Sequence, residues 1–474
     1  MSAGAGAAER LVVVGNGMAA TRLVEHLVQG RYPGEVTVLG EEAVPAYNRI
    51  LLSAVLEGTH DPGAITLRRP EWHAEHGVDL RRGSRVLALD RERGDVMLVD
   101  GTVVAWDRLV LATGSIPTLP PIRGLVRPDG TLHPAVHAFR SLADCHRLAA
   151  AVPGARRAVV VGGGLLGLQV ARALSLRGLF VEVVEGAGHL LHRQVGEQAG
   201  AVLARELRRL GTHVYTGSRA VRLGEDGLRL DTGVTLDTDL VVLTAGGRPS
   251  VALARAAGLA TRRGIVVDDH LASVTDPRVH ALGDCAEHQG TVGGYVAPAW
   301  EQAEVLARRL LGEEVAHRGT RGVARLRATG LDVAVLGEPE TTPGEVVEVS
   351  NPVAGRHGKL VVREGRIVAG ALVGDLSRVG RLTQLYDQGT RIGPYEAGDL
   401  LVPERPDDPD VPPAAALLPD EAEVCACAGV SAGRLRACAS AEQARATTRA
   451  GTGCGGCAAS VAALVGSREV VRSP

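Results

Sequence analysis

Four of the seven cysteines form two close pairs near the end of the sequence, Cys425 with Cys427 and Cys454 with Cys457. Four thiolates in two pairs suit a structural zinc ion or an iron–sulfur cluster. The gap between Cys425 and Cys427 is shorter than the gaps usual in zinc sites. The glycines of "GTGCGGC" leave backbone N–H groups free to approach inorganic sulfide. The pattern therefore favours a [2Fe–2S] cluster, with zinc or no metal as the alternatives.

A glycine loop, "GNGMAA", follows the apolar run "LVVV" and precedes an amphipathic stretch over 18–29. Gly15 permits a tight turn, Gly17 lets the backbone approach a pyrophosphate, and the small Ala20 allows the helix to pack closely on the strand. The helix N-terminus offers N–H groups and positive dipole to phosphate. Glu41 follows the second strand where a ribose-binding acid is expected. The pattern predicts a βαβ nucleotide-binding unit, with an ordinary β-turn-α as the alternative.

The same pattern recurs over residues 158–185, with the complete loop Gly162-x-Gly164-x-x-Gly167. Glu185 ends the strand that follows the helix. A carboxylate there accepts hydrogen bonds from both ribose hydroxyls and repels a 2′-phosphate, which favours NADH over NADPH. Two correctly spaced copies predict two dinucleotide-binding folds in one chain.

Three further β-type runs end in small residues: "LVLATGSIP" at 109–117, "LVVLTAGGRPS" at 240–250 and "VHALGDCAE" at 279–287. In the last run, Asp284 is either a turn residue or the acid that binds the ribityl chain of a flavin. Cys145, Cys285 and Cys438 are expected to be packing residues. The glycine loops have no Cys-x-x-Cys nearby, so we expect no redox-active dithiol, and no triad or carboxylate pair indicates hydrolysis.

The bulk composition is that of a globular protein of about three domains. The chain has 474 residues, 45% of them apolar and 22% charged, and a net charge of −2. This charge indicates neither a nucleic-acid nor a membrane-surface partner. The sequence has no apolar run long enough to span a membrane and begins with nothing like a signal peptide. We therefore expect a cytoplasmic protein, with reduced thiols.

The segments "VVVGNGMAA", "PAYNRILLS", "LVLATGSIP", "VVVGGGLLGL", "VVLTAGGRP" and "VHALGDCAE" occur in this order. Together they resemble the pyridine-nucleotide flavoprotein oxidoreductases, and within them the N-terminal part of the NAD(P)H nitrite reductase large subunit. The C-terminal "CAC…TRAGTGCGGC" resembles a bacterioferritin-associated-ferredoxin-type (BFD-like) [2Fe–2S] module. The resemblance covers about residues 10–465.

The resemblance implies an α/β chain with two Rossmann-like domains, one for FAD and one for NAD, a small α+β C-terminal reductase domain and a small helical [2Fe–2S] domain. The predicted ranges are 1–115 with 246–315 for FAD, 116–245 for NAD, 320–400 for the α+β domain, 401–420 for a proline-rich linker and 421–470 for the BFD-like domain.

The resemblance also implies that Arg49 contacts FAD and that residues 297–303 lie near the isoalloxazine ring. Gln169 stands where the family usually has glutamate, and we expect it to keep binding the nicotinamide carboxamide. The spacing between the cysteine pairs is a few residues short of the family pattern. The predicted cofactor-binding residues are Gly15, Gly17, Met18, Ala19, Glu41, Arg49, Ala112, Thr113, Gly114, Asp284, Pro298, Gly162, Gly164, Leu165, Leu166, Gly167, Gln169, Glu185 and Gly247, and the predicted metal ligands are Cys425, Cys427, Cys454 and Cys457.

The predicted function is an electron-transfer flavoprotein in which NADH reduces FAD and single electrons leave through the [2Fe–2S] cluster. No acid–base catalyst is assigned. Because no sirohaem region follows, we expect a separate acceptor, a molybdopterin-dependent assimilatory nitrate reductase subunit, with nitrite reductase as the variant; a homodimer is a further option. Alternatives are an opine- or amine-oxidase-type subunit, a ferredoxin or rubredoxin reductase with a fused cluster, and a zinc-stapled NADH sensor.

Overall fold

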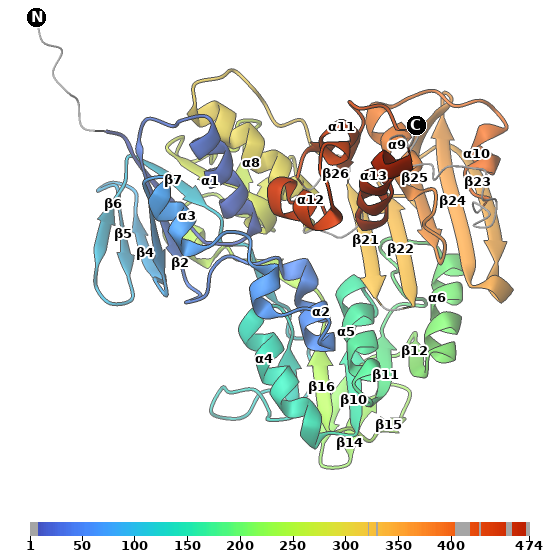
Figure 1. Cartoon of the computed structure of the whole chain (residues 1–474). Helices are drawn as coiled ribbons and strands as arrows, with labels where there is room; N and C mark the ends of the chain where they lie inside the picture. Colours follow the sequence, from blue (N-terminus) through green and yellow to red (C-terminus); the bar gives the residue numbers. More distant parts are fainter. Residues whose placement is uncertain are drawn as a thin grey trace, which may run out of the picture. The chain divides into compact units, whose positions relative to one another are not determined.

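The structure is a computed structural model of the chain (Figure 1). It describes residues 8–320, 322–328, 330–402, 418–425, 428–451 and 457–470. Most of the predicted linker, and the two predicted ligands Cys427 and Cys454, lie outside these residues. The chain forms two compact units. Unit 1 comprises Met1–Arg49, Pro62–Ile116 and Gly247–Thr320, and unit 2 comprises Ile50–Asp61, Pro117–Gly246 and Arg321–Pro474.

Unit 1 is built on a five-stranded parallel sheet in the order β19-β7-β1-β2-β3. Its strands are β1 (Arg10–Val14), β2 (Glu35–Gly40), β3 (Val78–Arg82), β7 (Arg108–Leu111) and β19 (Val279–Ala281). The connection from β1 to β2 is the helix α1 (Met18–Gln29), which packs along α8 (Val296–Leu310). The predicted helix over 18–29 is therefore present with the same bounds.

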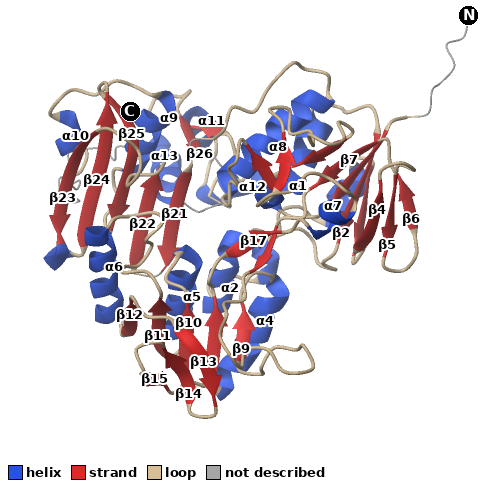
Figure 2. Cartoon of the chain, turned by 180° about the vertical axis from the view of Figure 1, so that it is seen from behind, coloured by secondary structure: helices blue, strands red, loops and turns tan. Residues whose placement is uncertain are grey.

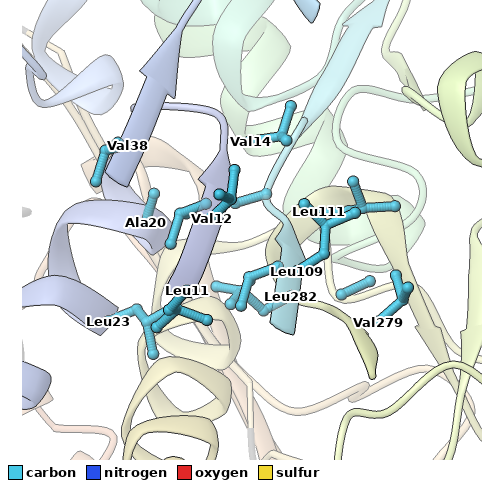
Figure 3. Close-up of a cluster of buried hydrophobic side chains, with 14 of the residues drawn as sticks. Leu11, Val12, Val14, Ala20, Leu23, Val38, Leu109, Leu111, Val279 and Leu282 are labelled. Carbon is cyan, nitrogen blue, oxygen red and sulfur yellow. The ribbon is translucent and has the colours of Figure 1, made fainter. Parts of the chain in front are cut away.

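The core of unit 1 lies around β1, because parallel strands covered on both faces are apolar on both faces. Leu11, Val12 and Val13 are almost completely buried. Figure 3 shows side chains of β1, β7 and β19 gathered in one cluster with Ala20 and Leu23 of α1. Every third or fourth residue of α1 faces this cluster, which is the pattern of an amphipathic helix.

Unit 1 also contains a three-stranded antiparallel sheet, β4 (Val86–Asp90), β5 (Asp95–Leu98) and β6 (Val103–Ala105). Its smaller elements are α3 (Pro70–Glu75), α7 (Ala252–Ala256), β17 (Gly247–Pro249), β18 (Ile265–Val267) and β20 (Ala286–His288), and the strand β8 (Ser115–Pro117) crosses its boundary. Turns of 3₁₀-helix in the whole chain are η1 (Arg49–Leu51), η2 (Pro62–Ile65), η3 (Val152–Gly154), η4 (Gly283–Cys285) and η5 (Pro352–Ala354).

Unit 2 repeats the parallel architecture, with the strand order β12-β11-β10-β16-β9. The strands are β9 (Val136–Ala138), β10 (Arg157–Val161), β11 (Phe180–Glu185), β12 (Thr212–Thr216) and β16 (Leu240–Leu243). Its helices are α2 (Leu52–Glu57), α4 (Leu142–Ala151), α5 (Leu165–Leu176) and α6 (Glu197–Arg209), and a small sheet joins β13 (Ala220–Gly224), β14 (Gly227–Leu230) and β15 (Thr235–Leu236).

Residues 50–61, which we predicted within the FAD domain, belong to unit 2 in the structure. The reason is packing, because α2 lies against α4 and α5. The Sγ atom of Cys145 donates to the carbonyl of Leu52, and the guanidinium of Arg177 donates to the carbonyl of Leu56 at 3.0 Å. These partners are far away in sequence, so local patterns did not indicate them.

The later part of unit 2 begins with a five-stranded antiparallel sheet in the order β21-β22-β25-β24-β23, visible as one broad layer in Figure 2. The strands are β21 (Val323–Ala328), β22 (Leu331–Leu336), β23 (Glu345–Asn351), β24 (Arg356–Arg363) and β25 (Arg366–Val373), followed by α9 (Val379–Gln388) and α10 (Glu396–Asp399). The last elements are β26 (Glu423–Cys425), β27 (Val430–Ser431), α11 (Ala432–Arg436), α12 (Ala441–Thr448) and α13 (Ala458–Val470). Within the described residues, no helix is both long and apolar enough to span a membrane.

Candidate nucleotide-binding sites

In unit 1, Gly15 allows three strands to approach one another at their carboxyl ends. Its N–H donates to the carbonyl of Leu39 in β2 at 2.8 Å. Its φ is +114°, and a Cβ there would lie 2.2 Å from the carbonyl oxygen of Ala112, which follows β7. Only glycine fits this position, because any other residue would collide with the neighbouring backbone.

Gly17 is the N-cap of α1 and lies beside open space. No heavy atom of the described structure would come within 4 Å of a Cβ at Gly17. Neither a capping side chain nor an acidic residue occupies the first turn, which contains Met18 and Ala19. The N–H groups of this turn therefore have room for an anion at the positive end of the helix dipole. This geometry fits the pyrophosphate of a dinucleotide.

Asp284 lies near the same helix end, in the 3₁₀ turn η4 that follows β19. Its Oδ2 accepts a hydrogen bond of 2.8 Å from the hydroxyl of Ser115. The preceding residue, Gly283, has a φ of +75°, and a Cβ there would lie 3.1 Å from the Cβ of Ala19. The close approach brings the carboxylate beside the start of α1. The role of Asp284 toward a flavin stays a prediction.

Gln302 is a residue of this site that the sequence reasoning did not assign. It is buried in α8, and its Oε1 accepts the N–H of Gly283 at 2.8 Å. Gln302 therefore fixes the turn that carries Asp284. The only signal in the sequence was its position within "APAWEQA". Pro298, in the same segment, is buried in the first turn of α8.

The segment after β7 is anchored from β17. The hydroxyl of Thr113 donates to the carbonyl of Ser250 at 2.8 Å, and the N–H of Ser250 donates to the carbonyl of Gly114 at 2.9 Å. Gly247 is exposed at the start of β17. Ala112, Thr113 and Gly114 thus follow the strand next to Gly15, as a segment that approaches a bound nucleotide must.

Glu41 and Arg49 lie at the other side of this sheet end. Glu41 is exposed after β2, with its Oε1 3.6 Å from Nε of Arg85. Arg49 forms an ion pair with Glu42, and its guanidinium lies 5.1 Å from the ring centre of Tyr47. The Tyr47 hydroxyl donates to Glu42 at 2.8 Å. The roles of Glu41 and Arg49 toward a cofactor stay predictions.

Unit 2 repeats the glycine geometry of unit 1. Gly162 has a φ of +117°, its N–H donates to the carbonyl of Val184 at 2.8 Å, and a Cβ would lie 2.6 Å from the carbonyl oxygen of Thr244. A Cβ on Gly167 would lie 1.9 Å from the carbonyl oxygen of Gly162, so the third glycine sets how closely α5 packs on the loop.

Gly164 is the N-cap of α5 and, like Gly17, would have no described heavy atom within 4 Å of a Cβ. The first turn, with Leu165 and Leu166, contains no acidic residue, and no side chain caps it among the described residues. Gln169 is buried one turn further along the helix. The second loop therefore also presents free N–H groups to an anion.

Glu185, at the end of β11, is buried and hydrogen bonded to the backbone. The residue is 8% exposed. One carboxylate oxygen accepts the N–H of Gly163 at 2.7 Å, and the other accepts the N–H of Ala187 at 2.8 Å. The side chain thus joins the glycine loop to the end of β11. Each oxygen keeps a further lone pair for a ribose hydroxyl.

Residues 9–305 match the family of pyridine nucleotide-disulphide oxidoreductases. The chain belongs to this family. The predicted resemblance to these oxidoreductases and the predicted α/β fold class are confirmed, whereas the BFD-like [2Fe–2S] module stays a prediction.

This chain is similar to known proteins in sequence and in structure, and three of them follow. The chain is 34% identical over 462 residues to the nitrite reductase [NAD(P)H] of Bacillus subtilis, covering 95% of this chain and 56% of the relative. It is 31% identical to the assimilatory nitrate reductase electron transfer subunit of the same organism, covering 95% of this chain and 58% of the relative. It thus spans little more than half the length of these relatives. Its structure is similar to a ferredoxin reductase from Rhodopseudomonas palustris, with a TM-score of 0.75, 26% identity, and coverage of 83% of this chain and 98% of that one.

Despite the name of the family, the single cysteines of the nucleotide-binding regions are placed as packing residues. Cys145 and Cys285 are both completely buried. Burial raises the pKa of the Cys145 thiol to about 11 and also raises the pKa of the Cys285 thiol. Both thiols therefore stay protonated near neutral pH, in which form they are poor nucleophiles.

The described part of the C-terminal region brings two predicted metal ligands into one small core. Cys425 at the end of β26 and Cys457 before α13 are 2% and 7% exposed and belong to the same hydrophobic cluster. The N–H of Gly451 donates to Sγ of Cys457 at 3.1 Å. Within the described residues no group of three or more metal-binding side chains is present. Cys427 and Cys454, the other two predicted ligands, fall outside them.

Proposed function

We propose that this protein is an NADH-dependent electron-transfer flavoprotein that binds FAD in unit 1 and NADH in unit 2. The observation that carries the proposal is the repeated glycine loop. Each unit has a parallel sheet, a glycine that excludes a side chain, and a helix N-terminus that opens onto free space beside Gly17 or Gly164. Two such sites suit two dinucleotides. Dinucleotide binding also fits the family of pyridine nucleotide-disulphide oxidoreductases.

The residues of unit 1 would hold FAD. The N–H groups of the first turn of α1 would bind the pyrophosphate, and Asp284 would accept hydrogen bonds from ribityl hydroxyls. Gln302 holds the Asp284 turn through Gly283, so it would act as a positioning residue. When bound, FAD accepts two electrons from a nicotinamide and can release them one at a time.

The residues of unit 2 would bind and orient NADH. The first turn of α5 would bind the pyrophosphate, and Glu185 would accept hydrogen bonds from the adenosine ribose. The hydrogen bond from the N–H of Gly163 to the carboxylate of Glu185 would hold the loop in the conformation that this binding needs, before the ligand binds. Such preorganisation reduces the cost of ordering the loop on binding.

We further propose that Cys425, Cys427, Cys454 and Cys457 hold a [2Fe–2S] cluster. The burial of Cys425 and Cys457 in one core supports this, as does the N–H to sulfur contact at Cys457. A cluster of this kind carries single electrons, and its potential depends on hydrogen bonds to its sulfurs. The Gly451 N–H would therefore raise the potential by stabilising the more negative, reduced state.

The acceptor that we propose is a molybdopterin-dependent assimilatory nitrate reductase in the cytoplasm. The similarity to a nitrate reductase electron transfer subunit supports this choice.

An anaerobic titration of the purified protein with NADH tests the proposal. We expect bleaching of the flavin absorption at about one equivalent of NADH, and then a spin-resonance signal from the reduced cluster. Cys457→Ser is expected to lose this signal, whereas Cys438→Ser, which is 7% exposed in the same core as Cys457, should keep it. Protein without bound flavin would contradict the FAD site, and equal iron and sulfide in both variants would contradict the ligand assignment.

A further inference from the structure

The chain leaves unit 1 through residues 313–320, which we name the exit segment. No residue of this segment belongs to a helix or strand, so its position depends on contacts with other parts of unit 1. The N–H of His317 donates to the carbonyl of Asp269 at 2.7 Å. The Nδ1 atom of His270 donates to the carbonyl of Val315 at 3.2 Å. The exit segment is therefore attached to the turn between β18 and β19.

His317 is the side chain that anchors the exit segment. It is 3% exposed, whereas Ala316 and Arg318 on either side of it are exposed. Its ring lies against the ring of His288 in β20, with the two ring centres 4.8 Å apart. His288 is also buried, and its Nε2 donates to Oδ1 of Asp269 at 2.8 Å. The two histidines and Asp269 thus form one cluster that holds the segment.

Three ionisable groups face the His317 ring, each from a different part of unit 1. Two of them are His288 and Asp269. The third is Glu301 of α8, whose Oε1 lies 3.9 Å from Nδ1 of His317. That Nδ1 atom has no hydrogen-bond partner among the described residues. Burial, together with the charge of His288, lowers the pKa of His317 to about 4, and the charge of Asp269 opposes this shift.

We infer that the exit segment is held by an acid-sensitive clamp, in which protonation of His317 detaches residues 313–320 at about pH 5 while the rest of unit 1 stays folded. The inference goes beyond the proposed function and depends on no cofactor. A protonated ring carries a charge that its buried position cannot hydrate, whereas detachment brings it into water. The contact of His270 persists in acid, because its Nδ1 donates whether the ring is neutral or charged.

Glu301 acts in the opposite direction. Burial raises the pKa of its carboxyl group, so the attached state takes up a proton there as pH falls, which favours attachment. A charged Glu301 also attracts a protonated His317, but the same proton uptake removes that charge in acid. Asp269 keeps its charge over this range, because the hydrogen bond from His288 lowers the pKa of its carboxyl group.

The sign and size of the effect follow from linkage. The pKa of His317 is about 4 in the attached state and has the ordinary value of 6.5 in the detached state, so the detached state binds protons first as pH falls. Attachment is most stable above about pH 6.5 and weakens toward pH 4. From about pH 7.5 to about pH 5 the detached population should rise about thirtyfold through His317 alone, and about tenfold if Glu301 offsets part of the effect.

Hydrogen exchange of the purified full-length protein, followed by mass spectrometry, tests the inference. Protection factors are corrected for the intrinsic pH dependence of amide exchange. The protection of the exit segment should be lower than that of β1 at both pH values, and it should fall about tenfold to thirtyfold from about pH 7.5 to about pH 5. His317→Gln should abolish this fall, whereas Glu301→Gln, which removes the opposing group, should make it steeper.

His73→Gln is the matched control. His73 is also a buried histidine whose pKa is lowered by burial, but it lies in α3. This variant should leave the pH dependence of the exit segment unchanged. Equal protection of the exit segment and β1 at both pH values would overturn separate detachment. A fall that survives in His317→Gln, or that His73→Gln abolishes equally, would overturn the role of His317. If His317→Gln does not fold, an unchanged or shallower fall in Glu301→Gln contradicts the clamp.

Discussion

Acid should destabilise unit 1, because two of its histidines are buried. His280 and His317 are 5% and 3% exposed. Burial lowers the pKa of each to about 4, helped by the charge of Arg108 for His280 and of His288 for His317. Both ring nitrogens of His280 and the Nδ1 atom of His317 have no hydrogen-bond partner among the described residues. Burial therefore favours the neutral form of each imidazole, although Nδ1 of His317 lies 3.9 Å from Oε1 of Glu301.

The sign and size of the effect follow from linkage. A folded pKa near 4, below the ordinary value of 6.5, means that the unfolded chain binds protons first as pH falls. The stability is complete above pH 6.5 and declines as pH drops toward 4. At pH 5, about 1.5 units below the unfolded value, each histidine should cost about 2 kcal/mol, or about 4 kcal/mol for the pair. This is a large part of the stability of an ordinary domain.

Tryptophan fluorescence reports on unit 1 alone, because the three tryptophans, Trp72, Trp106 and Trp300, all belong to it. Urea unfolding followed by this signal should give a free energy about 4 kcal/mol lower at pH 5 than at pH 7.5. His280→Asn should remove about half of the difference. Equal stability at both pH values, or an unchanged pH dependence in His280→Asn, would refute the reasoning.

Three substitutions test other parts of the structure. Gly15→Ala forces a side chain against the carbonyl of Ala112 at a positive φ, so purified protein should contain less than about a tenth of the normal FAD per chain; full occupancy would contradict the tight-turn role. Gly167→Ala places a methyl 1.9 Å from the carbonyl oxygen of Gly162 and should raise the KM for NADH at least tenfold while bound FAD stays constant, as measured by steady-state rates and flavin absorbance. Ser141→Ala removes the N-cap of α4 and should lower the free energy of unfolding of unit 2 by about 1 kcal/mol in circular dichroism melts, with no change in the tryptophan signal of unit 1.

The glycine loops could be predicted because a short stretch of sequence specifies both the buried strand and the turn that follows it. A run such as "LVVV" followed by Gly15 and Gly17 has the composition of a buried strand and the turn residues that a close backbone approach requires. The helix over 18–29 has the bounds expected from its apolar spacing. Neighbouring residues on one element determine these features, so the sequence alone indicates them.

The surroundings of the predicted residues could not be derived in this way. Gln302 holds the Gly283 turn only because α8 packs beside it, and Arg219 reaches Gly186 only because β12 pairs with β11 in parallel register. Such contacts depend on the order of strands in a sheet and on side-chain packing between distant segments, which no local pattern specifies.

The sequence by itself therefore determined where two nucleotide-binding loops and two cysteine pairs lie, since spacing along one chain segment expresses their chemistry. The tertiary structure alone determined that the carboxylate of Glu185 accepts the N–H groups of Gly163 and Ala187, and that the side chain of Arg219 lies against Gly186. The physical reason is that the effect of a charged group depends on the groups near it in space. The fold, and not the spacing along the chain, determines which groups those are.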